Sequence, residues 1–169
     1  REQALAKQYG VSRAPIRDAL LQLTQEGLLV AKPNCGVRVG SPSGEEIQPL
    51  VVELRRKIEV FALRKVFSKL TDSDVKRLED TVQRLKTACE NEDLAEVVQQ
   101  DMALHRHLLE ATGNTDLLAM WLPIVSRMFL HYSRHRNMME SYREHAAIVD
   151  AIRRKDRKAA IEALTANIQ

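Results

Sequence analysis

The chain is poor in the residues that interrupt helices or build disulfide scaffolds. Its 169 residues include 6 glycines, 5 prolines and 2 cysteines, and aromatic side chains make up 4%. Two cysteines, Cys35 and Cys89, are too few for a disulfide framework. No apolar run is long enough to cross a membrane, and no signal peptide is apparent. We therefore expect a cytoplasmic, mainly helical protein without a membrane partner.

The charged side chains divide the chain into two unequal parts. Residues 1–40 hold six Lys and Arg against three Asp and Glu, and the remaining residues hold 20 of each, so the net charge of +3 lies in the first part. We expect one domain over 1–40, a short linker over 41–44 and a second domain over 45–169. Forty residues are too few for an independent core, and the chain opens in mid-helix without Met. We therefore expect the first domain to be truncated at its start.

Residues 10–27 predict a helix of the kind that enters DNA. Ser12 is a good N-cap, Pro15 falls in the first turn, where its missing N–H costs little, and Gly27 can end the helix. Apolar side chains repeat at helical spacing and can be buried: Ile16, Leu20 and Leu23. Residues 5–9 end an earlier helix, and a tight turn separates the two. The pattern is that of a helix-turn-helix.

Arg13 and Arg17 fall together near the start of the exposed face of this helix. A recognition helix presents its base-reading side chains at that end. Two short strands follow, over 28–31 and 37–39, and the turn between them has Gly36 at a tip that can approach a DNA backbone. This order predicts a winged helix-turn-helix. The alternative is a small helical domain with a hairpin and two solvated arginines.

The residues that carry this pattern also match a family. They are Leu5-Ala6, Val11-Ser12-Arg13-Ala14-Pro15-Ile16-Arg17-Asp18-Ala19-Leu20, Leu23, Glu26-Gly27-Leu28 and Gly36. They resemble the winged-helix domain of GntR-family bacterial transcription regulators. The resemblance implies that Arg13 and Arg17 contact operator DNA, with Ser12 and the backbone at Gly36 in support. Ala14 stands where the family usually has Thr, so the operator contacts differ in detail.

From residue 45 onwards the pattern is helical. Helices are expected near 45–69, 72–91, 93–112, 115–137, 138–154 and 156–169. The first carries an apolar stripe that suits a bundle: Ile47, Leu50, Leu54, Ile58, Phe61 and Leu70. The expected fold class is therefore mainly α, with a winged helix-turn-helix followed by an all-α bundle of about six helices.

Asp101 and His105 are four residues apart, so they lie on one face of a helix and can reach one ion. His145 falls on a different helix and can complete the set from across the bundle. The three side chains are therefore candidates for a metal site. The alternative is structural, because a helical Asp–His pair is more often a hydrogen-bonded core histidine.

Residues 45–169 resemble the all-helical FCD effector domain of the FadR-like branch of GntR regulators. The matching residues are Arg55-Arg56-Lys57-Ile58-Glu59, Asp101-x3-His105, Gly113-Asn114 with Leu117-Leu118, and Glu144-His145-x2-Ile148. The resemblance implies a divalent zinc, nickel or manganese ion on Asp101, His105 and His145. Many members have a further His where this chain has Asn167. That residue then serves as a weaker oxygen ligand, or it hydrogen-bonds the effector in a metal-free site.

The patterns and resemblances together lead to a ligand-responsive transcription regulator. We expect double-stranded operator DNA as a partner, and a homodimer because one short helix reads too few base pairs. A small carboxylate is the expected effector, held by the metal and by Arg55, which matches the family arginine that faces the pocket. Arg127 is a second candidate because its helix should line the bundle. Arg55 and Glu59 are also spaced for an ordinary ion pair. Repression is the expected mode, with activation left open.

Other functions use the same residues. A metal-dependent hydrolase would bind water at Asp101, His105 and His145. However, no paired acid and base or nucleophile motif accompanies them, and an enzyme leaves the winged helix unexplained. A sensor without metal needs only the helical bundle, whereas a purely structural DNA-binding protein leaves that bundle without a role. We therefore expect a regulator and no enzyme activity.

Overall fold

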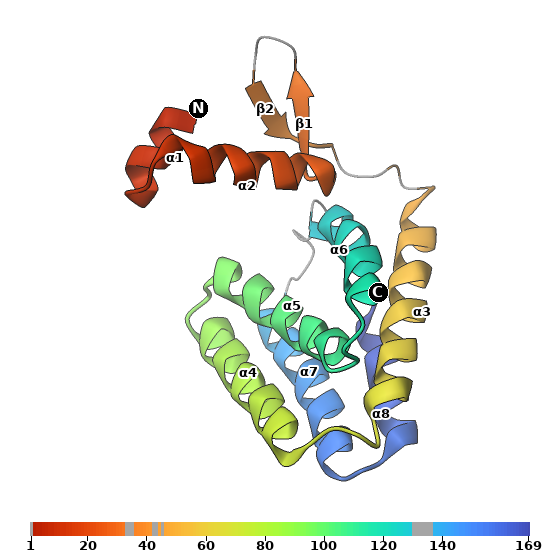
Figure 1. The fold of residues 1–169 in the computed structure, drawn as a ribbon. Helices are drawn as coiled ribbons and strands as arrows, with labels where there is room; N and C mark the ends of the chain where they lie inside the picture. Colours follow the sequence, from red (N-terminus) through yellow and green to blue (C-terminus); the bar gives the residue numbers. More distant parts are fainter. Residues whose placement is uncertain (1, 33–35, 42–43, 45, 130–136) are drawn as a thin grey trace.

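A computed structural model describes residues 2–32, 36–41, 44, 46–129 and 137–169 (Figure 1). The N-terminal part contains helices α1 (Glu2–Tyr9) and α2 (Arg13–Gln25) and strands β1 (Leu29–Lys32) and β2 (Gly36–Val39). Six helices follow: α3 (Gln48–Val66), α4 (Asp72–Glu90), α5 (Leu94–Glu110), α6 (Thr115–Phe129), α7 (Met138–Arg153) and α8 (Arg157–Asn167). The expected mainly-α class is confirmed. Cys35 and the expected end of the fourth bundle helix, at 130–136, lie outside the described residues.

The two ends of α2 differ in how their backbone groups are satisfied. The C-terminal end is a Schellman motif, in which Gly27 at φ +82° donates to the Thr24 carbonyl (3.1 Å) and Leu28 donates to the Leu23 carbonyl (3.0 Å). At the N-terminal end, Ser12 takes the N-cap position with extended backbone, but its side chain makes no capping hydrogen bond. The cap expected of its hydroxyl is therefore absent from this structure.

The strands form the expected wing. They pair antiparallel, with Leu29 opposite Val39 and Lys32 opposite Gly36. Gly36 begins β2 at φ +79°, a left-handed conformation that favours glycine, and no atom lies within 4 Å of the place where a Cβ would stand. The two-stranded ribbon projects away from the helices (Figure 1).

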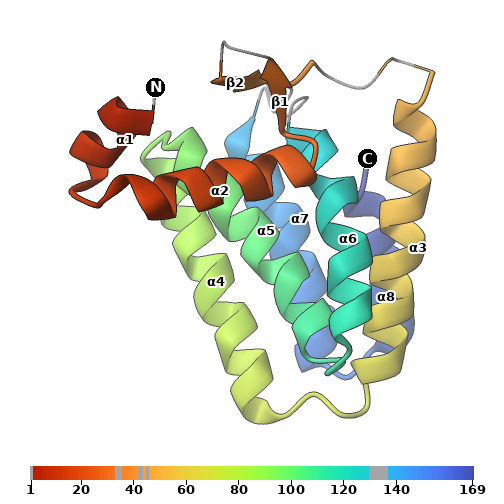
Figure 2. The same ribbon diagram turned by 45° about the horizontal axis from the view of Figure 1, so that its top comes forward.

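The helices α3–α8 form a bundle with α5 and α7 in its middle (Figures 1 and 2). Helix α5 contacts α3, α4, α6 and α7, and α7 also contacts α4 and α8. The largest buried cluster joins α3, α4, α5, α7 and α8 through Leu63, Leu78, Leu104, Leu108, Ile148, Ile152, Leu164 and Ile168. Polar side chains on the inner faces of α5 and α7 are therefore placed in the interior. None of the described helices combines the length and apolar character that a membrane span requires.

Polar and left-handed residues set several helix boundaries. Thr71 and Asp74 form a capping box at the start of α4. Glu92 and Lys155 follow α4 and α7 at φ 54° and φ 58°. Both positions end a helix with left-handed backbone, where glycine is the residue with the lowest steric cost.

The apolar stripe of α3 is only partly internal. Ile58 and Leu70 are half-buried, but the other members are exposed: Ile47 (45%), Leu50 (53%), Leu54 (40%) and Phe61 (54%). The buried side of α3 consists of Val51, Arg55, Glu59, Ala62, Leu63 and Val66. The expectation that the whole stripe serves the bundle is thus wrong, because α3 packs through a face that carries an ion pair among its apolar residues.

Candidate functional site

Asp101, His105 and His145, hereafter the Asp-His-His cluster, meet inside the bundle. Asp101 and His105 project from successive turns of α5, and α7 supplies His145. Both histidines are fully buried and Asp101 is 5% exposed. The two Nε2 atoms are 3.2 Å apart, and Asp101 Oδ1 lies 3.5 Å from that of His105 and 3.4 Å from that of His145. The three atoms surround one point.

The partners of the other ring nitrogens determine how the two imidazoles are protonated. His145 Nδ1 lies 2.7 Å from the carbonyl oxygen of Ser141, and His105 Nδ1 lies 2.6 Å from Glu59 Oε2. A carbonyl and a carboxylate only accept hydrogen bonds, so each Nδ1 carries the proton of a neutral ring. Each Nε2 then presents a lone pair toward Asp101 Oδ1. Three electron-rich atoms face one another, an arrangement that a cation relieves.

The triangle of ligand atoms has the size of a metal site. Two atoms that are each about 2.1 Å from one ion stand about 3.4 Å apart at the tetrahedral angle. The edges found here are 3.2, 3.4 and 3.5 Å. Two imidazole nitrogens and one carboxylate oxygen suit zinc, nickel or manganese. The residues therefore fit a divalent ion that keeps open coordination positions.

Burial and neighbouring charges shift the titration of the cluster. Burial opposes the charged form of Asp101, but His145 and His105 outweigh it and hold the pKa of this carboxyl well below its usual range. Burial also opposes the imidazolium of His145, yet Asp101 raises its pKa above 6.5. At His105 burial prevails and lowers the pKa. In a metal-free protein, a proton on His145 that faces Asp101 supplies a positive charge at pH values below this raised pKa.

Glu59 on α3 is fully buried and connects the cluster to two further side chains. Its Oε1 accepts from Arg55 Nε (2.7 Å) and from Trp121 Nε1 (2.6 Å), while Oε2 faces His105. Burial favours the neutral acid, but Arg55 and His105 outweigh it and lower the pKa of Glu59 to about 2. Arg55 thus makes the ion pair that its spacing allowed. The contacts of Glu59 with His105 and Trp121 were not predicted, because they join residues far apart in the sequence.

The other two expected effector contacts have different surroundings. Asn167, half-buried near the end of α8, donates from Nδ2 to Glu144 Oε2 (2.9 Å). Arg127 is exposed on α6, and its Nε would lie 3.8 Å from a Cβ at Gly27. Their roles at the effector stay predictions that these contacts do not favour.

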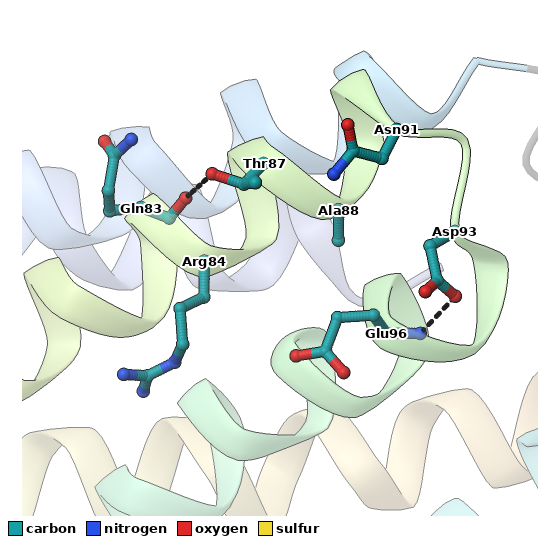
Figure 3. Close-up of a pocket in the computed structure, with 7 residues that line it drawn as sticks. All are labelled: Gln83, Arg84, Thr87, Ala88, Asn91, Asp93 and Glu96. Carbon is teal, nitrogen blue, oxygen red and sulfur yellow. Dashed lines mark hydrogen bonds between the residues drawn. The ribbon is translucent and has the colours of Figure 1, made fainter.

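Two surface pockets lie along α4 and α5. One has a volume of about 240 Å³ and is lined by Gln83, Arg84, Thr87, Ala88, Asn91, Asp93 and Glu96 (Figure 3). The second, of about 570 Å³, shares Arg84 and Glu96 with the first. Gln100 in the second pocket accepts from Arg84 (3.1 Å) and donates to Glu96 (2.8 Å). Neither pocket is lined by the Asp-His-His cluster.

The arginines expected to read DNA are on the surface of α2. The side chains of Arg13 and Arg17 are 63% and 65% exposed, and their Nη2 atoms lie 3.2 and 3.3 Å from Glu2 Oε2. Ser12 is exposed beside them. Sequence reasoning missed Glu2, although a carboxylate on the preceding helix is a natural partner for two adjacent guanidinium groups.

Both parts of the chain match family profiles. Residues 1–39 match "Bacterial regulatory proteins, gntR family", and residues 50–169 match the FCD domain. The chain belongs to the GntR family. Its FCD domain fits the FadR-like branch, as the resemblance implied. GntR-family regulators bind operator DNA.

Several GntR-family relatives cover most of the chain. The HTH-type transcriptional regulator YdhC of Bacillus subtilis is 28% identical over 167 residues, which are 94% of this chain and 73% of the relative. The gluconate operon transcriptional repressor of Bacillus subtilis is 25% identical over 175 residues, 98% and 71% of the two chains. The transcriptional repressor NanR of Escherichia coli is 29% identical over 194 residues, 99% and 72%.

Solved structures share the fold. E. coli McbR/YncC superposes with a TM-score of 0.82 and 23% identity, covering 99% of this chain and 82% of that chain. A GntR family member from Pseudomonas syringae has a TM-score of 0.61 and 25% identity, covering 99% and 72%.

Proposed function

We propose that the chain is a dimeric transcription regulator that binds operator DNA and responds to a small carboxylate held at a metal ion. In this proposal residues 1–40 are the DNA-binding domain, 41–44 the linker, and 45–169 the effector and dimerisation domain. Membership of the GntR family supports the DNA-binding half. The Asp-His-His cluster supports the effector half.

The observation that carries the metal proposal is the direction of the two imidazoles. Each Nδ1 faces an acceptor oxygen, and both Nε2 atoms lie close to Asp101 Oδ1. Zinc, nickel or manganese bound there would take His105, His145 and Asp101 as ligands. It would supply a Lewis-acidic centre with open positions for a ligand oxygen. The Asn167 amide nitrogen donates to Glu144, so a contact of this residue with the metal or the effector would use its carbonyl oxygen.

The buried charges favour a monoanionic effector. Asp101 and Glu59 contribute two negative charges and Arg55 one positive charge, all of them buried. With neutral histidines this set sums to −1, and a divalent ion changes the sum to +1. One carboxylate restores neutrality, which matters because an uncompensated buried charge is costly. Arg55 can contribute N–H donors to such a carboxylate beside the metal.

Exposed apolar side chains support the homodimer. Leu50, Leu54 and Phe61 are 53%, 40% and 54% exposed along α3, and contiguous apolar surface of this kind often marks an interface. A two-fold dimer would also present two copies of α2 to two half-sites. Light scattering on the full chain should give a dimer mass, and a monomer mass at every concentration would contradict it.

Among the residues that the structure describes, the hydrolase alternative lacks a suitable base beside the cluster. Glu59 is the buried carboxylate beside the cluster, and it already faces His105, Arg55 and Trp121. These three positively polarised groups stabilise the carboxylate, so its pKa is lowered to about 2. A carboxylate with so low a pKa is too weak a base to take a proton from water. We therefore propose a sensor and not an enzyme.

Metal analysis of the protein purified without chelator tests the metal site. The wild type should retain about one divalent ion per chain, and His145→Ala should lose it. His107→Ala is the matched control, because His107 also lies on α5 but its Nδ1 faces the Ala103 carbonyl (3.3 Å). Equal metal content in wild type and His145→Ala would overturn the site. Effector binding with no metal in any preparation would favour the metal-free sensor.

Calorimetry with a panel of small organic acids tests the effector. Acids should bind the metal-loaded wild type and release heat, and chelation of the metal should abolish the signal. Arg55→Lys keeps the charge but loses the fork of donors, so it should weaken acid binding and leave metal content unchanged. Binding that survives chelation would remove the metal from effector recognition.

A further inference from the structure

We propose that Glu59 is a positioning residue that joins the Asp-His-His cluster to α6, and that α6 carries the state of the cluster to the DNA-reading helix α2. One oxygen of this carboxylate faces His105 and the other holds Trp121 on α6. The inference rests on the proposed function and deepens it, because it names the residues by which an occupied site would change DNA binding.

The first link fixes a metal ligand. Glu59 Oε2 lies 2.6 Å from His105 Nδ1, and both side chains are fully buried. A carboxylate at this distance favours the tautomer of His105 that carries its proton on Nδ1 and leaves Nε2 unprotonated. Carboxylates behind a metal-bound histidine typically change metal affinity about 10–100-fold when they are removed.

The second link reaches α6. Trp121 is 1% exposed and donates its indole N–H to Glu59 Oε1 at 2.6 Å. Its ring packs with Ala62, Leu109, Leu117 and Val125 in one buried cluster. Because the indole is closely packed and away from solvent, a movement of the Glu59 carboxylate should move the indole with it. The indole in turn should move α6, the helix that carries it.

The third link joins α6 to α2. Ser126 and Arg127 follow Trp121 by one to two turns of α6. The C-terminal part of α6 lies close to the C-terminal end of α2 (Figure 2). Ser126 Oγ donates to Glu26 Oε2 at 3.4 Å, and the Arg127 guanidinium lies against Gly27. Among the hydrogen bonds and ion pairs between described residues, the Ser126–Glu26 bond is the one that joins residues 1–40 to the bundle. Helix α6 thus contacts the carboxylate at one point and the recognition helix at another.

The chain offers a built-in probe, since Trp121 is its one tryptophan. Zinc added to chelator-treated wild type should change the tryptophan emission, because it alters the carboxylate that holds the indole. Glu59→Gln should bind zinc about 10–100-fold more weakly, and at saturating zinc its emission change should be reduced or lost. Glu53→Gln is the matched control, because Glu53 is an exposed carboxylate on the same helix paired with Lys57 (2.8 Å). It should behave as wild type.

Operator binding provides the second readout. Zinc should shift the operator affinity of the chelator-treated wild type, and Glu59→Gln should show a reduced shift. Ser126→Ala should keep wild-type zinc affinity and emission change but lose most of the shift. Should Glu59→Gln not fold, Trp121→Phe tests the same link, since it keeps an aromatic ring and removes only the donor. It should retain zinc affinity and lose the shift.

The outcomes distinguish a failure of this inference from a failure of the proposed function on which it rests. A wild type that binds no metal overturns the metal site and the role of Glu59 with it. If the wild type binds zinc and responds to it, and Glu59→Gln has the same zinc affinity and emission change, only the role of Glu59 is overturned. A full operator shift in both Trp121→Phe and Ser126→Ala overturns the route through α6.

Discussion

Arg13 and Arg17 share one acceptor, because the Nη2 atoms of both lie within 3.3 Å of the same oxygen of Glu2. The hydrogen bonds from Arg17 and Arg13 lower the pKa of Glu2, so the carboxylate stays ionised at neutral pH. It holds two like charges side by side on the exposed face of α2. The arrangement keeps both guanidinium groups together on the surface of α2, where they are predicted to contact DNA.

Arg17→Ala should therefore weaken operator binding more than binding to random DNA. An arginine that reads guanine through two hydrogen bonds contributes about 1–3 kcal/mol of discrimination. Fluorescence anisotropy with operator and scrambled duplexes at one fixed salt concentration measures both affinities. Arg153→Ala on α7 serves as a control for the loss of one positive charge. Equal losses on both duplexes would reduce Arg17 to a phosphate contact.

The two ion pairs of α3 should differ in their effect on stability. Arg55–Glu59 (2.7 Å) is buried, whereas Lys57–Glu53 (2.8 Å) is exposed. Arg55→Ala leaves Glu59 buried without its cation and should lower the free energy of unfolding by about 3 kcal/mol or more. Lys57→Ala exposes its partner to water and should match wild type in urea unfolding. Similar midpoints for both variants would show that Glu59 is satisfied by its other partners.

Lys155→Gly should stabilise the protein. Lys155 sits at φ 58° after α7, a conformation that costs a side chain about 1–2 kcal/mol and costs glycine almost nothing. After the entropy lost by glycine, a gain of about 0.5–1 kcal/mol remains. Thermal unfolding measures it. Lys158→Gly, within α8, is the control and should lower the stability. If Lys155→Gly also lowers the stability, the Lys155 side chain makes a contact that contributes more than the backbone strain costs.

Local pattern was sufficient for much of this fold. Capping signals such as Thr71 with Asp74 and stops such as Gly27 act within one turn, so they can be read from neighbouring residues. The i, i+4 spacing likewise placed Asp101 and His105 on one face of α5. The pattern offered His145 as a candidate from another helix, and the family resemblance strengthened it, since spacing along one helix says nothing about which other helix comes near.

What the sequence did not reveal depends on packing across the bundle. Trp121 and His105 reach Glu59 from different helices, and no periodicity encodes that meeting. The stripe of α3 was misjudged for a related reason. Apolar spacing identifies a face, but it does not distinguish a face that packs inside one chain from a face left exposed, as Leu50 and Phe61 are.

The last prediction concerns pH and metal together. Asp101 outweighs burial and raises the pKa of His145, so below that value the metal-free protein carries a proton on His145. This protonation stabilises the metal-free fold fully below the ordinary pKa of 6.5, and the contribution is lost as pH rises through the raised value. Metal binding needs the neutral ring, so each ion displaces one proton in that range. His105 contributes no second proton at neutral pH, because burial lowers its pKa.

The zinc affinity should consequently rise about tenfold for each pH unit from pH 6.5 upward, and level off above the raised pKa of His145. At a fixed excess of zinc the added stability should grow by about 1.4 kcal/mol per unit over the same interval. Thermal unfolding of wild type with zinc and with chelator, at pH 6.5, 7.0, 7.5 and 8.0, measures this difference. His145→Ala should show no zinc-dependent shift at any pH. If the zinc-dependent stabilisation of the wild type does not vary with pH, His145 is already neutral in the metal-free protein. The metal then displaces no proton from the side of the ring that faces Asp101.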